Sequence, residues 1–75
     1  MAGETYKLID LVGTSEVGVS EAIDAAVSRA ARTLQGLEWF EVRQIRGSIA
    51  DGHVREYQVD MRIAFRVMDD SEFEA

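Results

Sequence analysis

Apolar and polar residues change their spacing twice along this chain. Residues 5–12 are rich in Tyr, Leu, Ile and Val and run into Gly13-Thr14-Ser15, which predicts a strand that ends in a turn. The next segment places apolar residues three and four positions apart, as in an amphipathic helix. The residues of this stripe are Val19, Ala22, Ile23, Ala26, Val27, Ala30 and Leu34. Gly36 is expected to take the left-handed conformation that ends such a helix.

Two further apolar runs, residues 37–50 and 53–68, lie on either side of Asp51-Gly52, a dipeptide typical of tight hairpins. The second run alternates strictly between apolar and polar positions. The first changes phase, because Phe40 and Val42 are even-numbered whereas the apolar residues after them are odd-numbered. A β-bulge near residues 43–44 restores the alternation. It then places Trp39 and Arg46 on one polar face.

These elements predict an α+β fold, a single βαββ domain over residues 1–75. Its three strands are expected to form a mainly antiparallel sheet partly wrapped around the one helix. The ordered core is expected over about residues 4–68, with a flexible acidic tail over residues 69–75. One helix covers only one face of the sheet. The other face carries Trp39, Gln58, Arg46 and Arg66 and is left for solvent, a partner or a ligand.

Composition limits how such a small domain is stabilised. A chain of 75 residues buries too little surface for a robust core, and it has no Cys for disulfides and one His for metal binding. Oligomerisation is the remaining supplement. The net charge of -6 opposes nucleic-acid binding. No apolar run is long enough to span a bilayer and no secretory leader is recognisable, so a cytoplasmic location without membrane contact is expected.

Constellations typical of catalysis are missing from the sequence. No Cys nucleophile exists, and His53 stands beside the predicted hairpin turn, where a solvated histidine is expected. Residues 13–18 join a strand to a helix but lack the Lys and Gly spacing of phosphate-binding loops. Glu38 and Glu41 flank Trp39 and fit a solvated strand edge as well as an acid/base pair. The chain is therefore predicted to be a binding protein and not an enzyme.

Trp39 has two interpretations. It is either a core or interface aromatic or a stacking platform for a planar ligand. The Gln58 amide offers a donor and an acceptor, which match the edge of a uracil-like or flavin pyrimidine ring, although a solvated strand position explains it too. Arg46, Arg62 and Arg66 are either solvated ion-pair partners or a phosphate site. The residues thus indicate an oligomeric binder of an aromatic small molecule.

Four short motifs, in this order and spacing, resemble the dodecin family. They are YKLIDLVGTS at residues 6–15, LEWFEV at 37–42, IRG at 45–47 and YQV at 57–59. Dodecins are small flavin-binding proteins with a βαββ fold, and twelve copies form a hollow shell. The resemblance therefore implies a homododecamer that binds FMN, with riboflavin or FAD as alternatives.

The resemblance also assigns roles to individual residues. Trp39 matches the tryptophan that stacks on the flavin ring at subunit contacts, and Gln58 matches the glutamine that bonds its pyrimidine edge. Arg46 matches a residue near the FMN phosphate, and Glu38 the acidic position beside the tryptophan. Some bacterial members bind coenzyme A at a second site. The plausible counterparts of that site are Tyr6, Lys7, Arg29, Arg32 and Arg66.

The resulting hypothesis is that the protein stores flavin and protects it from photochemistry by stacking it on Trp39. A flavin-dependent redox enzyme is the second hypothesis, although the chain has no nucleotide-binding motif and no obvious proton donor. The third is a purely structural shell in which the tryptophan serves only the interface.

Overall fold

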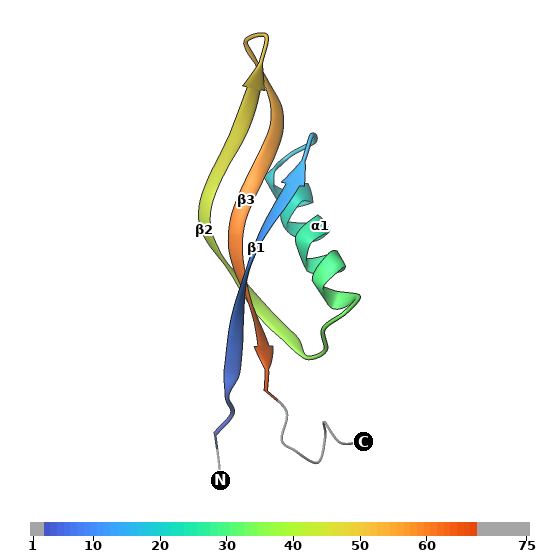
Figure 1. Ribbon diagram of the computed structural model, residues 1–75, viewed down its shortest axis with the longest axis vertical. Coiled ribbons are helices and arrows are strands. Elements are labelled where there is room, and N and C mark those ends of the chain that lie inside the picture. Colours follow the sequence, from blue (N-terminus) through green and yellow to red (C-terminus); the bar gives the residue numbers. More distant parts are fainter. Residues whose placement is uncertain (1–2, 68–75) are drawn as a thin grey trace.

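The computed structural model describes residues 3–67 and contains one helix and three strands. In chain order these are β1 (Tyr6–Ser15), α1 (Val19–Ala31), β2 (Leu37–Ala50) and β3 (His53–Arg66). The sheet has the order β1-β3-β2, with both pairs antiparallel, and α1 lies against one of its faces (Figure 1). The predicted βαββ fold is confirmed. The predicted acidic tail at residues 69–75 lies outside the described residues.

The first strand is longer than the sequence pattern predicted. Gly13, Thr14 and Ser15 were expected to form a turn but belong to β1, where they pair with Val59, Gln58 and Tyr57. The reason is packing against the helix. A Cβ atom at Gly13 would lie only 2.2 Å from the Ala22 carbonyl oxygen, so only glycine lets α1 approach this strand. The chain turns instead at Glu16–Gly18, where the Ser15 hydroxyl accepts hydrogen bonds from the N–H groups of Val17 and Gly18.

The helix ends earlier than the position of Gly36 suggested. It stops at Ala31, and the N–H groups of Arg32 and Thr33 bond to carbonyls three residues back in a tightened final turn. Gly36 does adopt a positive φ of 76°, as expected of a glycine after a helix. Its carbonyl accepts a hydrogen bond from the N–H of Arg66, so this glycine leads the chain into β2 at the end of β3.

The hairpin and the bulge are both confirmed. Asp51 and Gly52 have φ values of 53° and 78°, the positive pair that a two-residue hairpin turn with matching twist requires. The β2–β3 register shifts between Val42 and Gln44, where the phase of the apolar residues changes. Two further shifts, at Leu37/Trp39 and Ser48/Ile49, were not predicted.

The core is thin and lies between α1 and the two strands it covers. The helix contributes Ala22, Ala26 and Ala30, and β3 contributes Val59, Met61 and Ile63. Three of these six residues are alanines, whose small side chains bring the helix close to the sheet but bury little apolar area each. Such a core stabilises a single chain only weakly.

The apolar side of β2 is left uncovered because α1 packs mainly on β1 and β3. We call this surface the β2 apolar strip; its residues are Phe40, Val42, Ile45 and Ile49, which are 44, 41, 55 and 75% exposed. The hairpin also extends well past the end of the helix (Figure 1). The radius of gyration is 15.5 Å, compared with about 11 Å for a compact chain of this length. The single chain thus leaves an apolar strip exposed on an elongated body.

Candidate functional site

The sheet face turned away from α1 gathers most of the residues that the sequence singled out. We call it the open face. It is formed by the even-numbered residues 6–14 of β1 and 56–66 of β3, with Trp39, Glu41, Gln44, Arg46 and Ser48 of β2. Trp39 and Arg46 share this face because the bulge after Val42 shifts the phase between them. The predicted placement of both residues is confirmed.

An aromatic pair forms one end of the open face. Trp39 lies opposite Ala64 in the register, and its ring is 4.8 Å from that of Tyr6, tilted by 60°. Tyr6 belongs to β1 and Trp39 to β2, so the two side chains meet over the central strand. Ala64 lies between them and is completely buried. A small residue at this point lets the indole lie across β3, and Trp39 remains 43% exposed for a further planar group.

A carboxylate fixes the outer edge of the indole. The Nε1 atom of Trp39 donates a hydrogen bond to Oε2 of Glu41 over 3.0 Å. Glu41 follows Trp39 by two positions, and residues two apart in a strand share a face. The sequence suggested either a solvated strand edge or an acid/base pair with Glu38 for Glu41, although this spacing beside a tryptophan could have indicated the contact. Tyr6 on one side and Glu41 on the other hold the indole in one orientation.

Polar side chains form a row of hydrogen bonds farther along the face. Nε of Arg46 donates to Oε1 of Gln58 at 3.0 Å, and Nη1 of Arg46 donates to Oε1 of Gln44 at 3.2 Å. The Gln58 amide nitrogen donates to Oε1 of Glu56 at 3.0 Å. Ser48, opposite Glu56 in the register, has a buried hydroxyl without a partner among the described residues. The row therefore offers unused polar atoms next to an oriented amide.

Trp39 and the polar row are far apart in one chain. Trp39 lies opposite Ala64 and Arg46 lies opposite Gln58, six positions earlier on β3. Six residues of strand span about 20 Å, which is longer than a three-ring planar ligand. A ligand that stacks on Trp39 therefore cannot also contact Gln58 of the same chain.

The remaining candidates divide between the two faces. Arg66 lies opposite Tyr6, and its Nε is 3.9 Å from Oε1 of Glu4, so both belong to the Trp39 end of the open face. Glu38 sits in the bulge beside Trp39. By contrast, Lys7 shares the helix side of β1 with Ile9. Arg29 and Arg32 lie near the end of α1. The five residues predicted for a coenzyme A site are thus split by the sheet.

Asp10 bridges two other arginines in the middle of the open face. Its Oδ1 lies 3.1 Å from Nε of Arg62 and 3.4 Å from Nη1 of Arg43. All three side chains are substantially exposed, so the ion pairs contribute little stability each. They do neutralise Arg62, which the sequence had grouped with Arg46 and Arg66 as a candidate phosphate ligand. Arg46 is the better placed of these for an anion, since its Nη2 has no partner among the described residues.

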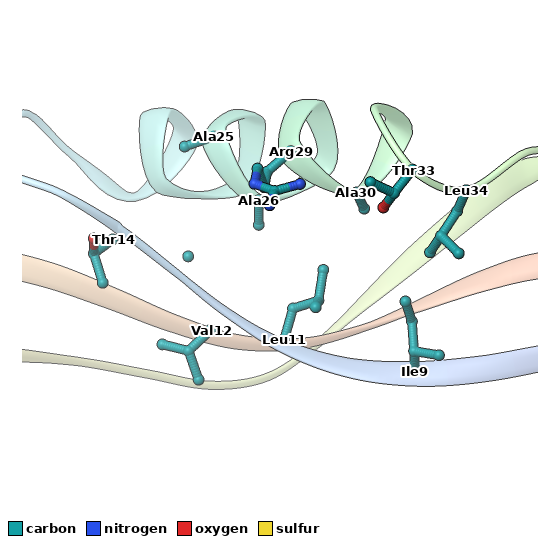
Figure 2. Close-up of a pocket in the computed structure, with 11 residues that line it drawn as sticks. Ile9, Leu11, Val12, Thr14, Ala25, Ala26, Arg29, Ala30, Thr33 and Leu34 are labelled. Carbon is teal, nitrogen blue, oxygen red and sulfur yellow. The ribbon is translucent and has the colours of Figure 1, made fainter.

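A separate cavity of 510 Å³ lies between α1 and β1, on the helix side of the sheet (Figure 2). Ile9 and Leu11 extend from β1 towards Ala26 and Ala30 of the helix, whereas Val12 points away (Figure 2). Arg29 is the one charged residue in its lining. A smaller cavity of 150 Å³ reaches Trp39 from the helix side of the sheet, since its lining includes Val27, Phe40 and Ile63. Its volume is below the range of about 300–1,000 Å³ typical of ligand pockets, so a ligand stacked on Trp39 would need further walls.

Tyr6 is a titratable group with a clearly altered environment. Partial burial raises the pKa of its phenol above the usual 10.0, and the carboxylates of Glu4 and Glu38 raise it further. The phenol therefore stays neutral beside Trp39 at physiological pH. Among residues 3–67, no three His, Cys, Asp or Glu side chains come together as a metal site would require. Within the same range, no helix has the length and apolar character to cross a bilayer.

Comparison with known proteins identifies the family. The dodecin family model matches residues 5–68. The chain belongs to the dodecin family. The dodecin of Thermus thermophilus is 52% identical over 65 residues, which cover 87% of this chain and 94% of that protein. The resemblance expected from the four motifs is confirmed.

Solved dodecin structures agree with the fold. Dodecin from Streptomyces coelicolor is 46% identical and superposes with a TM-score of 0.88, covering 93% of this chain and all of that one. The tt0972 protein of Thermus thermophilus is 51% identical, with a TM-score of 0.86 over 89% of this chain and 98% of that one. Family membership supports the assignment of this chain as a small flavin-binding protein. The family is non-enzymatic, and its members form oligomers.

Proposed function

We propose that this protein stores FMN and protects it from photochemistry by stacking it on Trp39 where copies of the chain meet. The observation that carries the proposal is the half-exposed indole, fixed by Tyr6 and Glu41 on a face with no catalytic constellation. An oriented indole stacks on a planar π-system and expels water from both surfaces. An indole in contact with an excited flavin transfers an electron to it and takes it back, so the excitation is lost before other chemistry occurs.

FMN is favoured over riboflavin by the environment of Arg46. Its Nε and Nη1 groups bond to Gln58 and Gln44 and hold the guanidinium in place, while Nη2 has no partner among the described residues. A guanidinium that is already oriented binds phosphate with little further loss of side-chain freedom. Riboflavin lacks the phosphate. We therefore expect Arg46→Ala to weaken FMN binding several-fold more than riboflavin binding, with Arg55→Ala as the control for loss of positive charge.

A homododecamer supplies the missing walls in this proposal. The separation of Trp39 from Gln58 supports a pocket whose residues come from different copies. The β2 apolar strip supports a large contact between copies, because burying such side chains removes exposed apolar area from water. Replacing Ile45 by Glu at the centre of the strip is expected to reduce the mass measured by light scattering. A monomeric mass for the unmodified protein would contradict the proposal.

Titration of FMN fluorescence tests the proposed function directly. The unmodified protein should quench the emission strongly, and Trp39→Ala should leave most of it. Trp39→Phe keeps an aromatic ring but is a poorer electron donor, so it should bind FMN with incomplete quenching. Equal quenching by the unmodified protein and Trp39→Ala would rule out stacking as the mechanism.

Two alternatives make different predictions. A redox enzyme would bleach the flavin absorbance rapidly when the loaded protein is mixed anaerobically with NADH, whereas a storage protein leaves the flavin oxidised. A purely structural shell would have the oligomeric mass but show no affinity for FMN. An absorbance spectrum of the purified protein, followed by chromatography of the released ligand, identifies the flavin.

Coenzyme A remains a proposal for a second site. Arg29 supports it, because this cation lines the cavity between α1 and β1 and has no ion-pair partner among the described residues. Tyr6 and Arg66 lie on the opposite face of the sheet, so one chain does not bring all five proposed residues to a single site. Calorimetric titration with coenzyme A should detect binding that Arg29→Ala abolishes and Arg55→Ala preserves.

A further inference from the structure

Two charged neighbours hold the amide of Gln58 at its two ends. Its oxygen accepts from the guanidinium of Arg46 on β2, and its nitrogen donates to the carboxylate of Glu56 on the same strand, each over 3.0 Å. Both are charge-assisted hydrogen bonds, which are stronger than neutral ones. If the amide turned over, its NH₂ group would face the guanidinium and its oxygen would face the carboxylate. The charges therefore enforce one orientation.

The same contacts leave part of the amide unused. A glutamine oxygen has two lone pairs and its nitrogen two N–H donors. Arg46 occupies one lone pair and Glu56 one donor, so the same amide keeps one acceptor and one donor. This is the pattern that pairs with a ring N–H next to a ring carbonyl. Such an imide edge is present on the pyrimidine ring of a flavin.

We propose that Glu56 is a positioning residue that fixes the direction in which Gln58 presents its acceptor and donor, and so selects planar ligands with an imide N–H. This inference rests on the proposed function. Glu56 acts through Gln58 and does not itself contact the ligand. Because Oε1 is held beside Arg46, a ligand without the N–H leaves that oxygen facing a group that cannot donate. Sites built around a hydrogen bond discriminate strongly against analogues that lack it.

Riboflavin and N3-methylriboflavin provide the test, since they differ only at this nitrogen, where a methyl group replaces the hydrogen. The unmodified protein should bind riboflavin at least about tenfold more tightly. In Glu56→Gln the side chain at position 56 can either donate or accept, so Arg46 alone still favours one orientation of Gln58 and that orientation is enforced less strongly. The preference for riboflavin should then fall to about threefold or less, because a turned amide can donate to the ring carbonyls of the methylated compound. Glu56→Ala, which removes the partner entirely, should behave in the same way.

Asp60→Asn is the matched control. It removes one negative charge from the same face of the same strand, and Asp60 has no hydrogen bond to Gln58. It should keep the full preference for riboflavin. An unchanged preference in both Glu56 variants would overturn the inference and leave the proposed function standing. Failure of the unmodified protein to bind riboflavin or FMN would overturn both.

Discussion

Trp39 and Gln58 lie on the same face of the sheet, but they are far apart along it. The residue opposite Trp39 on β3 is Ala64, six strand positions from Gln58. The indole faces Ala64, whereas Gln58 pairs with Arg46. The separation of about 20 Å exceeds the length of a flavin ring system. In the proposed site, stacking and edge recognition of one ring therefore use two different copies of the chain.

Mixed assemblies provide a direct test of this division. Trp39→Ala and Gln58→Ala should each bind FMN poorly when assembled alone. When the two variants are refolded together in equal amounts, about a quarter of the sites should receive an intact tryptophan from one copy and an intact glutamine from another. Quenching of FMN fluorescence should return to that extent.

The control for this experiment is a mixture of the two variants assembled separately and combined afterwards without exchange. It should show no recovery. If co-refolding restores nothing although both variants enter the same particles, both residues act from one chain and the shared pocket is wrong.

The contact between Glu41 and the indole predicts a second effect. Glu41→Ala removes the acceptor for Nε1 of Trp39, so the ring can rotate about its side-chain bonds. FMN affinity should fall by about three- to tenfold, the range expected for loss of one charge-assisted hydrogen bond at an exposed site. Fluorescence anisotropy of Trp39 should fall as well. Glu16→Ala, in the exposed turn before α1, is the control and should alter neither quantity.

Close packing at Gly13 makes a prediction about stability. In Gly13→Ala the new Cβ would collide with the Ala22 carbonyl and with Cβ of Ala26, at 2.2 and 2.9 Å. Because the nearest atom belongs to helix backbone, α1 must move away from β1. We expect destabilisation of about 1–3 kcal/mol, measured by denaturant unfolding at fixed protein concentration. Gly3→Ala meets nothing within 4 Å and should change stability by less than about 0.5 kcal/mol.

The raised pKa of Tyr6 predicts how the stability of the protein changes at alkaline pH. Its phenol is neutral when protonated, and the folded state raises its pKa above 10.0, first through burial and then through nearby carboxylates. The folded state therefore binds this proton more tightly than the unfolded state does. The contribution of the Tyr6 phenol to the stability of the folded state is fully present below pH 10 and is lost as the pH rises through the folded pKa.

Thermal unfolding at several pH values checks this prediction. The melting temperature should fall more steeply above pH 10 in the unmodified protein than in Tyr6→Phe. Below pH 9 the two profiles should run parallel. Equal slopes above pH 10 would show that the phenol does not lose its proton with a raised pKa in the folded state.

Much of the fold was predictable because its signals are local. The helical stripe from Val19 to Leu34, the Asp51-Gly52 turn and the alternation through β3 each depend on residues close in sequence. Even the bulge could be located, because Phe40 and Val42 are out of phase with the apolar residues that follow. The role of Gly13 could not be foreseen, since it depends on a helix carbonyl nine residues away that approaches only in the folded chain.

The sequence by itself determined the βαββ order, the shared face of Trp39 and Arg46 and the family. These features depend on the spacing of apolar residues and on short motifs, which involve residues close together in the sequence. Only the tertiary structure decided that Tyr6 meets Trp39 across Ala64, that Glu41 anchors the indole and that Glu56 and Arg46 orient the Gln58 amide. Those relationships depend on strand register and side-chain rotamers. The register is fixed by pairing between strands that are distant in sequence. The spacing of two places Glu41 beside Trp39 and Glu56 beside Gln58 on one face, but it does not fix the rotamers that make their contacts.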